Sequence, residues 1–200
     1  KVIESLISQN VDFKGLYKNF YGSPLHMAVA LDNANLAKIL IAKNADVNTK
    51  NKKGQSPLYE AVLGLRLEIA KLLVAHGADV NTWNNNDMTP LYSNVIWGNE
   101  VALNLLLDEG ADINIKNNAG ITPLQYAVFH TYDRKYYKKI LEKGGTSHIE
   151  LIDLIIKEDL QSIKKLVSSN PTILKMLAND SPTPLHYAVA INDKIAGYLI

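Results

Sequence analysis

The side chains best suited to acid–base or metal chemistry in this sequence are five histidines. No two of them stand four residues apart, the spacing that places two imidazoles on one helix face for a metal ion. The chain has no cysteine, which excludes a thiolate nucleophile, a disulfide and a cysteine-based zinc site. No acidic pair lies in a catalytic motif, so we predict neither a catalytic centre nor a bound metal. The histidines are His26, His76, His130, His148 and His186.

The glycines do not form a phosphate-binding loop. Neither G-x-x-x-x-G-K-[ST] nor G-x-G-x-x-G occurs, so we predict no cofactor and no small-molecule substrate. The stretch from Tyr132 to Lys143 combines five basic residues with tyrosines and is a candidate nucleic-acid patch. Its alternative interpretation is the solvated outer face of a helix. The 21 basic and 20 acidic residues of the chain nearly cancel, which disfavours nucleic acid as a partner.

Composition and hydropathy limit the class of protein. The 200 residues suffice for one sizeable domain, and 47% hydrophobic with 20% charged residues is typical of a soluble globular chain. The sequence contains no run of about 18 apolar residues, and its start lacks the apolar core of a secretory signal. We therefore expect no membrane partner and a cytoplasmic or other intracellular location. Because the first residue is Lys, we also expect a piece of a longer chain.

Two short phrases recur along the sequence with a period of 33 residues. The first is Ser or Thr followed by Pro and Leu, and it begins at positions 23, 56, 89 and 122. The second is Ala-Asp-Val/Ile-Asn, and it begins at positions 45, 78 and 111. Because the two phrases keep one register, chance is a poor explanation. The chain is therefore predicted to consist of repeated structural units.

Each period contains the signals for two helices and a turn. Ser or Thr before Pro predicts a helix start, because the hydroxyl caps free amides and the first helical turn does not need the N–H that Pro lacks. A second helix is indicated by apolar residues at helical spacing, such as Ile69, Leu72 and Leu73, and it should end at Gly77. Residues 46–54 alternate polar and apolar and suit a hairpin finger. The Asn that ends the second phrase is expected to bond within its own finger.

These residues resemble the ankyrin repeat family. The family pattern of G-x-TPLH-x-A, a second helix ending in LLL-x-x-GAD and a following V-N is matched most closely from Gly22 to Asn118. The resemblance implies an all-α repeat solenoid of helix-turn-helix units with β-hairpin fingers. It also implies that His26 and His186, at the His position of TPLH, tie neighbouring repeat backbones together. The implied function is to bind a partner protein along a concave face made of fingers and first helices.

The repeat register divides the sequence into a regular block and a less regular one. We expect residues 1–143 to form the regular block, with a partial first repeat over 1–17 and repeats beginning near positions 18, 51, 84 and 117. The next Thr-Pro-Leu after position 122 begins at 183, which is 61 residues later rather than 66. We expect an irregular link at 144–149, which lacks the finger phrase. Residues 150–200 should hold a degenerate fifth repeat without the TPLH start and a truncated sixth repeat.

In ankyrin stacks, partner contacts come from finger tips and from two positions of each first helix. Counting seven and eight residues on from each Ser/Thr anchor gives these helix positions, and the resulting row is unusually apolar. For Ile96 and Phe129 the alternative is packing between repeats. The counted positions are Ala30, Leu31, Leu63, Gly64, Ile96, Trp97, Phe129 and His130.

We predict that an apolar surface around Trp83 and Trp97 docks a hydrophobic helix or loop of a partner protein. Lysines of the first complete finger would steer an acidic flank of that partner toward it. The predicted partner-binding residues are Lys50, Lys52, Lys53, Trp83, Asn86, Met88, Ile96, Trp97, Ile121, Phe129 and His130.

The leading functional hypothesis is therefore a non-enzymatic protein-interaction scaffold. An alternative is the targeting or substrate-recruiting region of a larger effector, toxin or enzyme whose catalytic part lies outside these residues. A third hypothesis is a structural array without a specific partner, which predicts that the apolar row is buried. The Lys and Asn bias and the irregular second block resemble ankyrin proteins of intracellular bacteria and some viruses, which implies a location in the cytoplasm of a host cell.

Overall fold

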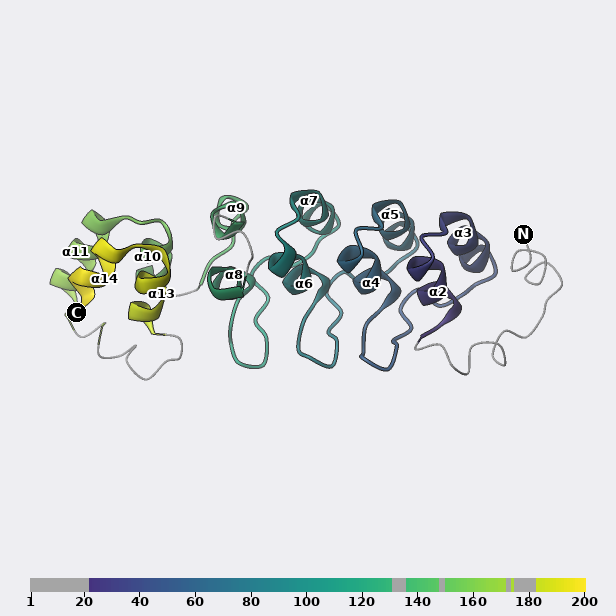
Figure 1. The fold of residues 1–200 in the computed structure, drawn as a ribbon, viewed down its shortest axis with the longest axis horizontal. Coiled ribbons are helices and arrows are strands. Elements are labelled where there is room, and N and C mark those ends of the chain that lie inside the picture. Colours follow the sequence, from purple (N-terminus) through teal and green to yellow (C-terminus); the bar gives the residue numbers. More distant parts are fainter. Residues whose placement is uncertain (1–21, 131–135, 148–149, 172–173, 175–182) are drawn as a thin grey trace. The chain divides into compact units, whose positions relative to one another are not determined.

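A computed structural model describes residues 22–130, 136–147, 150–171, 174 and 183–200 of the chain (Figure 1). The partial first repeat expected over 1–17 lies outside these residues. Across the described part, all regular elements are helices and no β-strand occurs. The helices are α2 (Pro24–Ala30), α3 (Ala34–Ala42), α4 (Pro57–Leu63), α5 (Leu67–Ala75), α6 (Pro90–Trp97), α7 (Glu100–Asp108), α8 (Pro123–His130), α9 (Tyr136–Glu142), α10 (Glu150–Ile156), α11 (Leu160–Ser169), α13 (Pro184–Ile191) and α14 (Asp193–Leu199).

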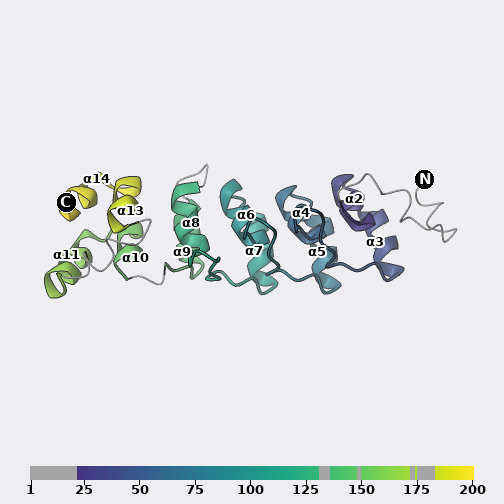
Figure 2. The same cartoon turned by 90° about the horizontal axis from the view of Figure 1, so that it is seen from below.

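The chain divides into two compact units. The first comprises residues 1–94 and 99–112, and the second comprises residues 95–98 and 113–200. In the first unit, α3, α5 and α7 form an outer row, while α2, α4 and the start of α6 form an inner row from which the fingers project (Figure 1). Helix α2 packs on α3 and on α4, and Figure 2 shows the helix pairs α2–α3 and α4–α5 from below. This is the helix-turn-helix repeat architecture that the sequence predicts.

The first helix of each regular repeat begins at the Pro of the recurring phrase. These prolines stand at positions 24, 57, 90 and 123, each 33 residues after the last. In α4, the hydroxyl of the residue before the Pro caps the helix. This residue is Ser56, and its Oγ accepts a hydrogen bond of 3.1 Å from the Tyr59 N–H. The second helices are capped by Asn33 and Asn99, whose side chains accept from backbone N–H groups at 2.9 Å. Local capping therefore sets the helix starts.

The connection between the two helices of a repeat needs one residue in the left-handed region of backbone conformation. That residue directs the next N–H back to the first helix, as in the bond of 2.9 Å from the Asn33 N–H to the Ala28 carbonyl. The pair α10–α11 keeps this connection, with a bond of 3.0 Å from the Asp159 N–H to the Leu154 carbonyl. The left-handed residues are Asp32 (φ 49°), Leu65 (φ 55°), Gly98 (φ 67°) and Glu158 (φ 59°).

Each finger is a tight turn closed by backbone hydrogen bonds across it, such as the bond of 2.9 Å from the Gly54 N–H to the Asn51 carbonyl. The Asn51 N–H donates to the Gln55 carbonyl at 2.9 Å, and the corresponding bonds run from Asn84 to Met88 and from Asn117 to Ile121. These bonds lie within a turn of five residues and do not continue into a β ladder. The β-hairpin strands implied by the resemblance are therefore not seen in the residues that the structure describes.

The Asn that ends the second recurring phrase binds the following repeat. The Asn48 Nδ2 donates to the Gly77 carbonyl at 3.0 Å, and its Oδ1 accepts from the Asp79 N–H at 2.8 Å. Asn81 and Asn114 each make the same pair of bonds. The expectation that these side chains bond within their own finger was wrong, because stacking places the end of the next second helix beside them. Only the backbone N–H of Asn48 stays within the finger, on the Asp46 carboxylate.

The register lengthens by one residue in the fourth repeat. Asn48 and Asn81 reach residues 29 and 31 positions further on, whereas Asn114 reaches 30 and 32. The extra residue makes Gly145 the counterpart of the buried Ala78, and a Cβ there would lie 2.6 Å from the Ile140 Cγ2. The boundaries expected at 144 and 150 remain predictions.

We expect the Asn48→Ala substitution to lower the free energy of unfolding by about 1–2 kcal/mol, since it removes two hydrogen bonds that join successive repeats. Urea denaturation followed by far-UV circular dichroism measures this loss. The control is Asn86→Ala, whose side chain is exposed on the next finger and makes no described bond. Equal unfolding free energies for the two variants would contradict the prediction.

Candidate functional site

His26 is buried and joins two repeats. Its Nδ1 accepts from the Ser23 backbone N–H at 3.0 Å and lies 2.9 Å from the Ser23 Oγ. Its Nε2 lies 2.9 Å from the Gln55 carbonyl oxygen of the next finger. Because a carbonyl only accepts, the ring proton belongs on Nε2 and Nδ1 is the acceptor. Both ring nitrogens are thus used in the structural contact that the resemblance implies, which leaves neither for a metal ion or a substrate.

The other described histidines also cap helices. The His186 Nδ1 lies 2.7 Å from the Thr183 Oγ1 at the start of α13, and the exposed His76 Nδ1 lies 2.8 Å from the Leu72 carbonyl at the end of α5. The side chains of His130 and His148 lie outside the described residues. Among the residues that are described, no three acidic or histidine side chains gather in a group that could hold a metal ion.

The basic aromatic stretch packs its rings into the second unit. Tyr136 and Tyr137 of α9 are buried, and burial raises the pKa of the Tyr137 hydroxyl. The Lys138 Nζ lies 2.7 Å from the Glu158 Oε1, and this contact raises the lysine pKa and lowers the carboxyl pKa. The Asn192 Nδ2 donates to the same carboxylate at 3.0 Å. The two tyrosine rings cannot stack on nucleobases, so this part of the stretch fits the helix-face interpretation.

The counted positions of the first helices expose apolar side chains. Leu31 is 57% exposed and Leu63 is 40% exposed, both at the ends of inner helices of the first unit. Trp97, in the second unit, is 58% exposed, while the neighbouring Ile96 is half-buried. Ala30 and Gly64 are exposed as well, and the side chains of Phe129 and His130 lie outside the described residues.

The finger residues are more constrained than the sequence suggests. The Lys50 Nζ donates to the Trp83 carbonyl at 2.9 Å, which fastens one finger to the next. The Trp83 ring lies 5.8 Å from the buried Tyr92 ring, tilted by 42°, so it also serves packing. Of the remaining predicted residues, Lys52, Lys53 and Asn86 are exposed, and Met88 and Ile121 are half-buried. Trp83 and Trp97 belong to different compact units, and one surface around both remains a prediction.

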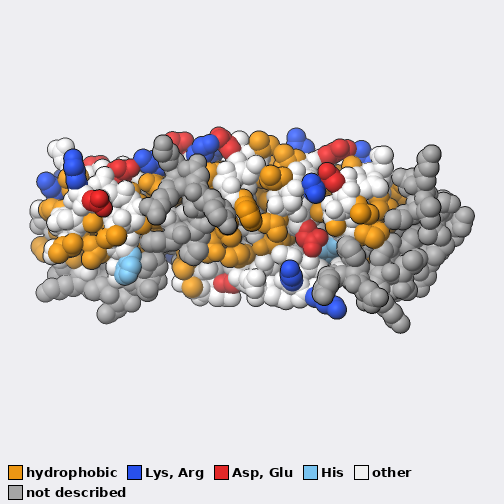
Figure 3. Space-filling model, viewed as in Figure 1, with side chains coloured by type: hydrophobic (Ala, Val, Ile, Leu, Met, Phe, Trp, Pro, Cys, Tyr) orange, Lys and Arg blue, Asp and Glu red, His pale blue; other side chains and the backbone are white. Residues whose placement is uncertain are grey.

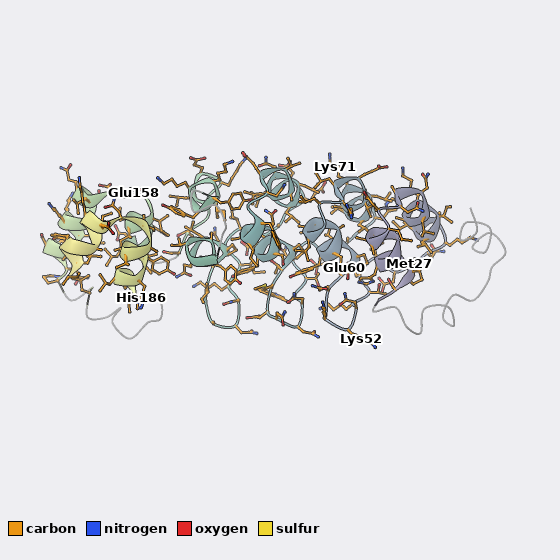
Figure 4. All side chains as sticks on the ribbon, viewed as in Figure 1. Met27, Lys52, Glu60, Lys71, Glu158 and His186 are labelled. Carbon is orange, nitrogen blue, oxygen red and sulfur yellow. The ribbon has the colours of Figure 1, made fainter. Side chains whose placement is uncertain are left out.

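The first unit contains a groove of about 330 Å³ between α2 and α4. Figure 3 shows hydrophobic side chains over α2 on this face, with acidic and basic side chains over α4. Figure 4 places Met27 and Glu60 on the inner helices, Lys52 at a finger tip and Lys71 pointing away from the outer row. The groove is lined by Val29, Ala30, Lys53, Gln55, Glu60, Leu63, Gly64 and Arg66.

Two family models match the chain. One, for ankyrin repeats in three copies, matches residues 1–84, and the other, for ankyrin repeats in many copies, matches residues 72–127. The chain belongs to the ankyrin repeat family. Ankyrin repeats are generally protein–protein interaction modules and are typically non-catalytic. A search of curated proteins found no match. None of the described helices is long and apolar enough to cross a membrane.

The His of the ankyrin TPLH phrase is replaced by Tyr59 in the second regular repeat and by Gln125 in the fourth. Both replacements make structural contacts. The Ser93 hydroxyl of α6 donates a hydrogen bond to the Tyr59 hydroxyl of α4. This bond links two inner helices of the first unit. The Gln125 Oε1 accepts from the Thr122 N–H at 2.8 Å, so it caps its helix as His26 does. The side chains at these positions therefore take part in packing or capping.

Sequence reasoning missed two ionic groups of the ankyrin groove. Glu60 accepts a hydrogen bond of 2.7 Å from the Asn51 Nδ2, and Arg66 lies 3.6 Å from the Asp32 carboxylate. The repeat register contained a signal for the second contact, because Arg66 occupies the capping position held by Asn33 and Asn99. An arginine side chain has no oxygen with which to cap the helix, and its guanidinium group is available for an ion pair.

We expect His26→Ala to lower the free energy of unfolding by about 2–3 kcal/mol, because it removes a helix cap and leaves the Gln55 carbonyl without its partner. The exposed His76→Ala substitution is the control and should cost well under half as much. Chemical denaturation of both variants measures the difference. A loss as large in His76→Ala would contradict the assignment of His26 as the joining residue.

The ion pair between Lys138 and Glu158 predicts a pH dependence of stability. Because folding lowers the Glu158 pKa, its stabilising contribution is present above the unfolded value of about 4.3 and is lost as pH falls through the folded value. Wild type should therefore lose more stability than Glu158→Gln between about pH 5 and about pH 3. Urea denaturation of both proteins across that range checks this, and parallel losses would refute it.

Proposed function

We propose that the chain is a scaffold that binds a partner protein through the exposed apolar ends of its first helices and through its finger tips. The observation that carries the proposal is the exposure of Leu31, Leu63 and Trp97. Large apolar side chains that are exposed at regular positions mark protein interfaces more often than bare surface. A structural array without a partner predicts that this row is buried, which does not hold for these three side chains.

The fingers supply the polar part of the same proposed surface. Lys52 and Lys53 are exposed at the tip of the first complete finger, where they attract an acidic partner and speed its association. The hydrogen bond between Lys50 and the Trp83 carbonyl supports this role, because it holds two adjacent fingers in a fixed arrangement before a partner arrives. A preorganised surface loses less conformational freedom on binding.

The proposal is tested by affinity capture from a cell lysate with wild type, with Leu31→Ser combined with Leu63→Ser, and with Trp97→Ser. The control is Val101→Ser, which removes a side chain of 58% exposure from the outer helix α7. We expect the variants at Leu31, Leu63 and Trp97 to retain about tenfold less of the captured partner, and the control to match wild type. Circular dichroism establishes that every variant is folded. Equal capture by all variants would overturn the proposed surface.

A further inference from the structure

Leu65 combines strain with exposure. Its φ of 55° lies in the left-handed region, which a side chain branched at Cγ adopts only at a cost. At the same connection in other repeats stand Asp32, which tolerates this conformation, and Gly98, which has no Cβ. Glu158 shares the conformation but uses its carboxylate to bind Lys138. Leu65 has no such compensation, because 48% of its surface is exposed to solvent.

Leu65 lies next to the groove between α2 and α4 in the chain, but it is not one of the residues that line it. Its chain neighbours Gly64 and Arg66 both line the groove, and so does Leu63. The ion pair of 3.6 Å between Arg66 and Asp32 holds this connection beside the equivalent connection of the preceding repeat. Leu31 therefore adds a third exposed leucine at the same end. Leu31, Leu63 and Leu65 are all exposed at the ends of α2 and α4, and these three side chains are called the leucine rim.

The charges of the groove are satisfied except for one. Glu60 is held by the Asn51 amide, and Arg66 is paired with Asp32. The ammonium group of Lys53 makes no contact with the described residues, although its backbone joins two fingers. Asp46, the acidic residue of that finger, already accepts a hydrogen bond from the Asn48 N–H. A carboxylate of a partner would therefore supply the counter-ion that Lys53 lacks.

We propose that this groove binds a short segment of a partner protein that carries a large aliphatic side chain and a nearby carboxylate. The aliphatic side chain packs on the leucine rim, with Leu65 as its anchor, and the carboxylate pairs with Lys53. The strain at Leu65 persists because the residue contacts the partner rather than the core. This inference rests on the proposed function and narrows it to one class of partner.

The decisive variant is Leu65→Asn, because strain relief and lost contact act in opposite directions. Asn adopts the left-handed conformation readily, so the thermal unfolding midpoint should rise by about 2 °C. Binding should weaken at least about tenfold, because the anchor is gone. A residue with a purely structural role would not raise stability and lower binding together.

The binding probe is a displayed library of random peptides of about 12 residues, selected on the whole chain. We expect the enriched peptides to share a Leu, Ile or Met with an Asp or Glu close by. Lys53→Glu should shift the selected flank from acidic to basic. The control Lys71→Glu changes an exposed lysine that points away from the outer row (Figure 4) and should leave the selection unchanged.

The outcomes separate this inference from the proposed function. Enriched peptides that lose binding with Leu31→Ser and Leu63→Ser but not with Leu65→Asn would leave the surface intact and overturn the anchor. A lower unfolding midpoint for Leu65→Asn would overturn the strain argument. No enrichment, enrichment without acidic residues, or self-association of the chain through the groove would overturn the proposed partner class. Enrichment that depends on Trp97 alone would support the scaffold and overturn the groove.

Discussion

One side-chain amide per repeat holds this stack together. The last carbonyls of a helix have no partner within the helix, and the following N–H turns away from it. The Asn at position 48, and its counterparts at 81 and 114, satisfies one carbonyl and one N–H of the next repeat with a single side chain. An amide carries a donor and an acceptor on one rigid plane, so it fixes distance and orientation together. These bonds hold the end of each following second helix beside the Asn side chain.

The same constraint explains how the stack absorbs irregularity. The extra residue of the fourth repeat leaves both Asn114 bonds in place, because the inserted position lies before the helix end that they contact. The connection that follows lacks a finger phrase. Its polar groups are instead bound by the Asp153 carboxylate, which accepts hydrogen bonds from the Thr146 hydroxyl and the Ser147 N–H. Backbone groups at a helix end need partners, and any well-placed oxygen or amide serves.

A stack fixed from within leaves its inner helix ends free to vary. Small residues such as Ala28 and Ala61 are fully buried where helices approach closely. The positions just beyond them face outward, and there the chain places leucines and a tryptophan. Leu65 is the clearest example of an exposed apolar residue at a helix end. Neither its left-handed backbone conformation nor its exposure stabilises the folded chain. Buried and exposed apolar residues are therefore close neighbours at the ends of the inner helices.

The sequence by itself determined the repeat architecture, the helix starts at Pro24 and its counterparts, and the apolar character of the inner row. These follow from local rules, since capping and helical periodicity act within a few residues. It did not determine the partner of Asn48, the packing of Trp83 on Tyr92, the ion pair of Arg66 or the backbone of Leu65. Three of these join residues 9 to 34 positions apart, and the fourth is imposed by the connection between two packed helices. Such contacts depend on how helices and fingers pack in space, so only the tertiary structure could decide them.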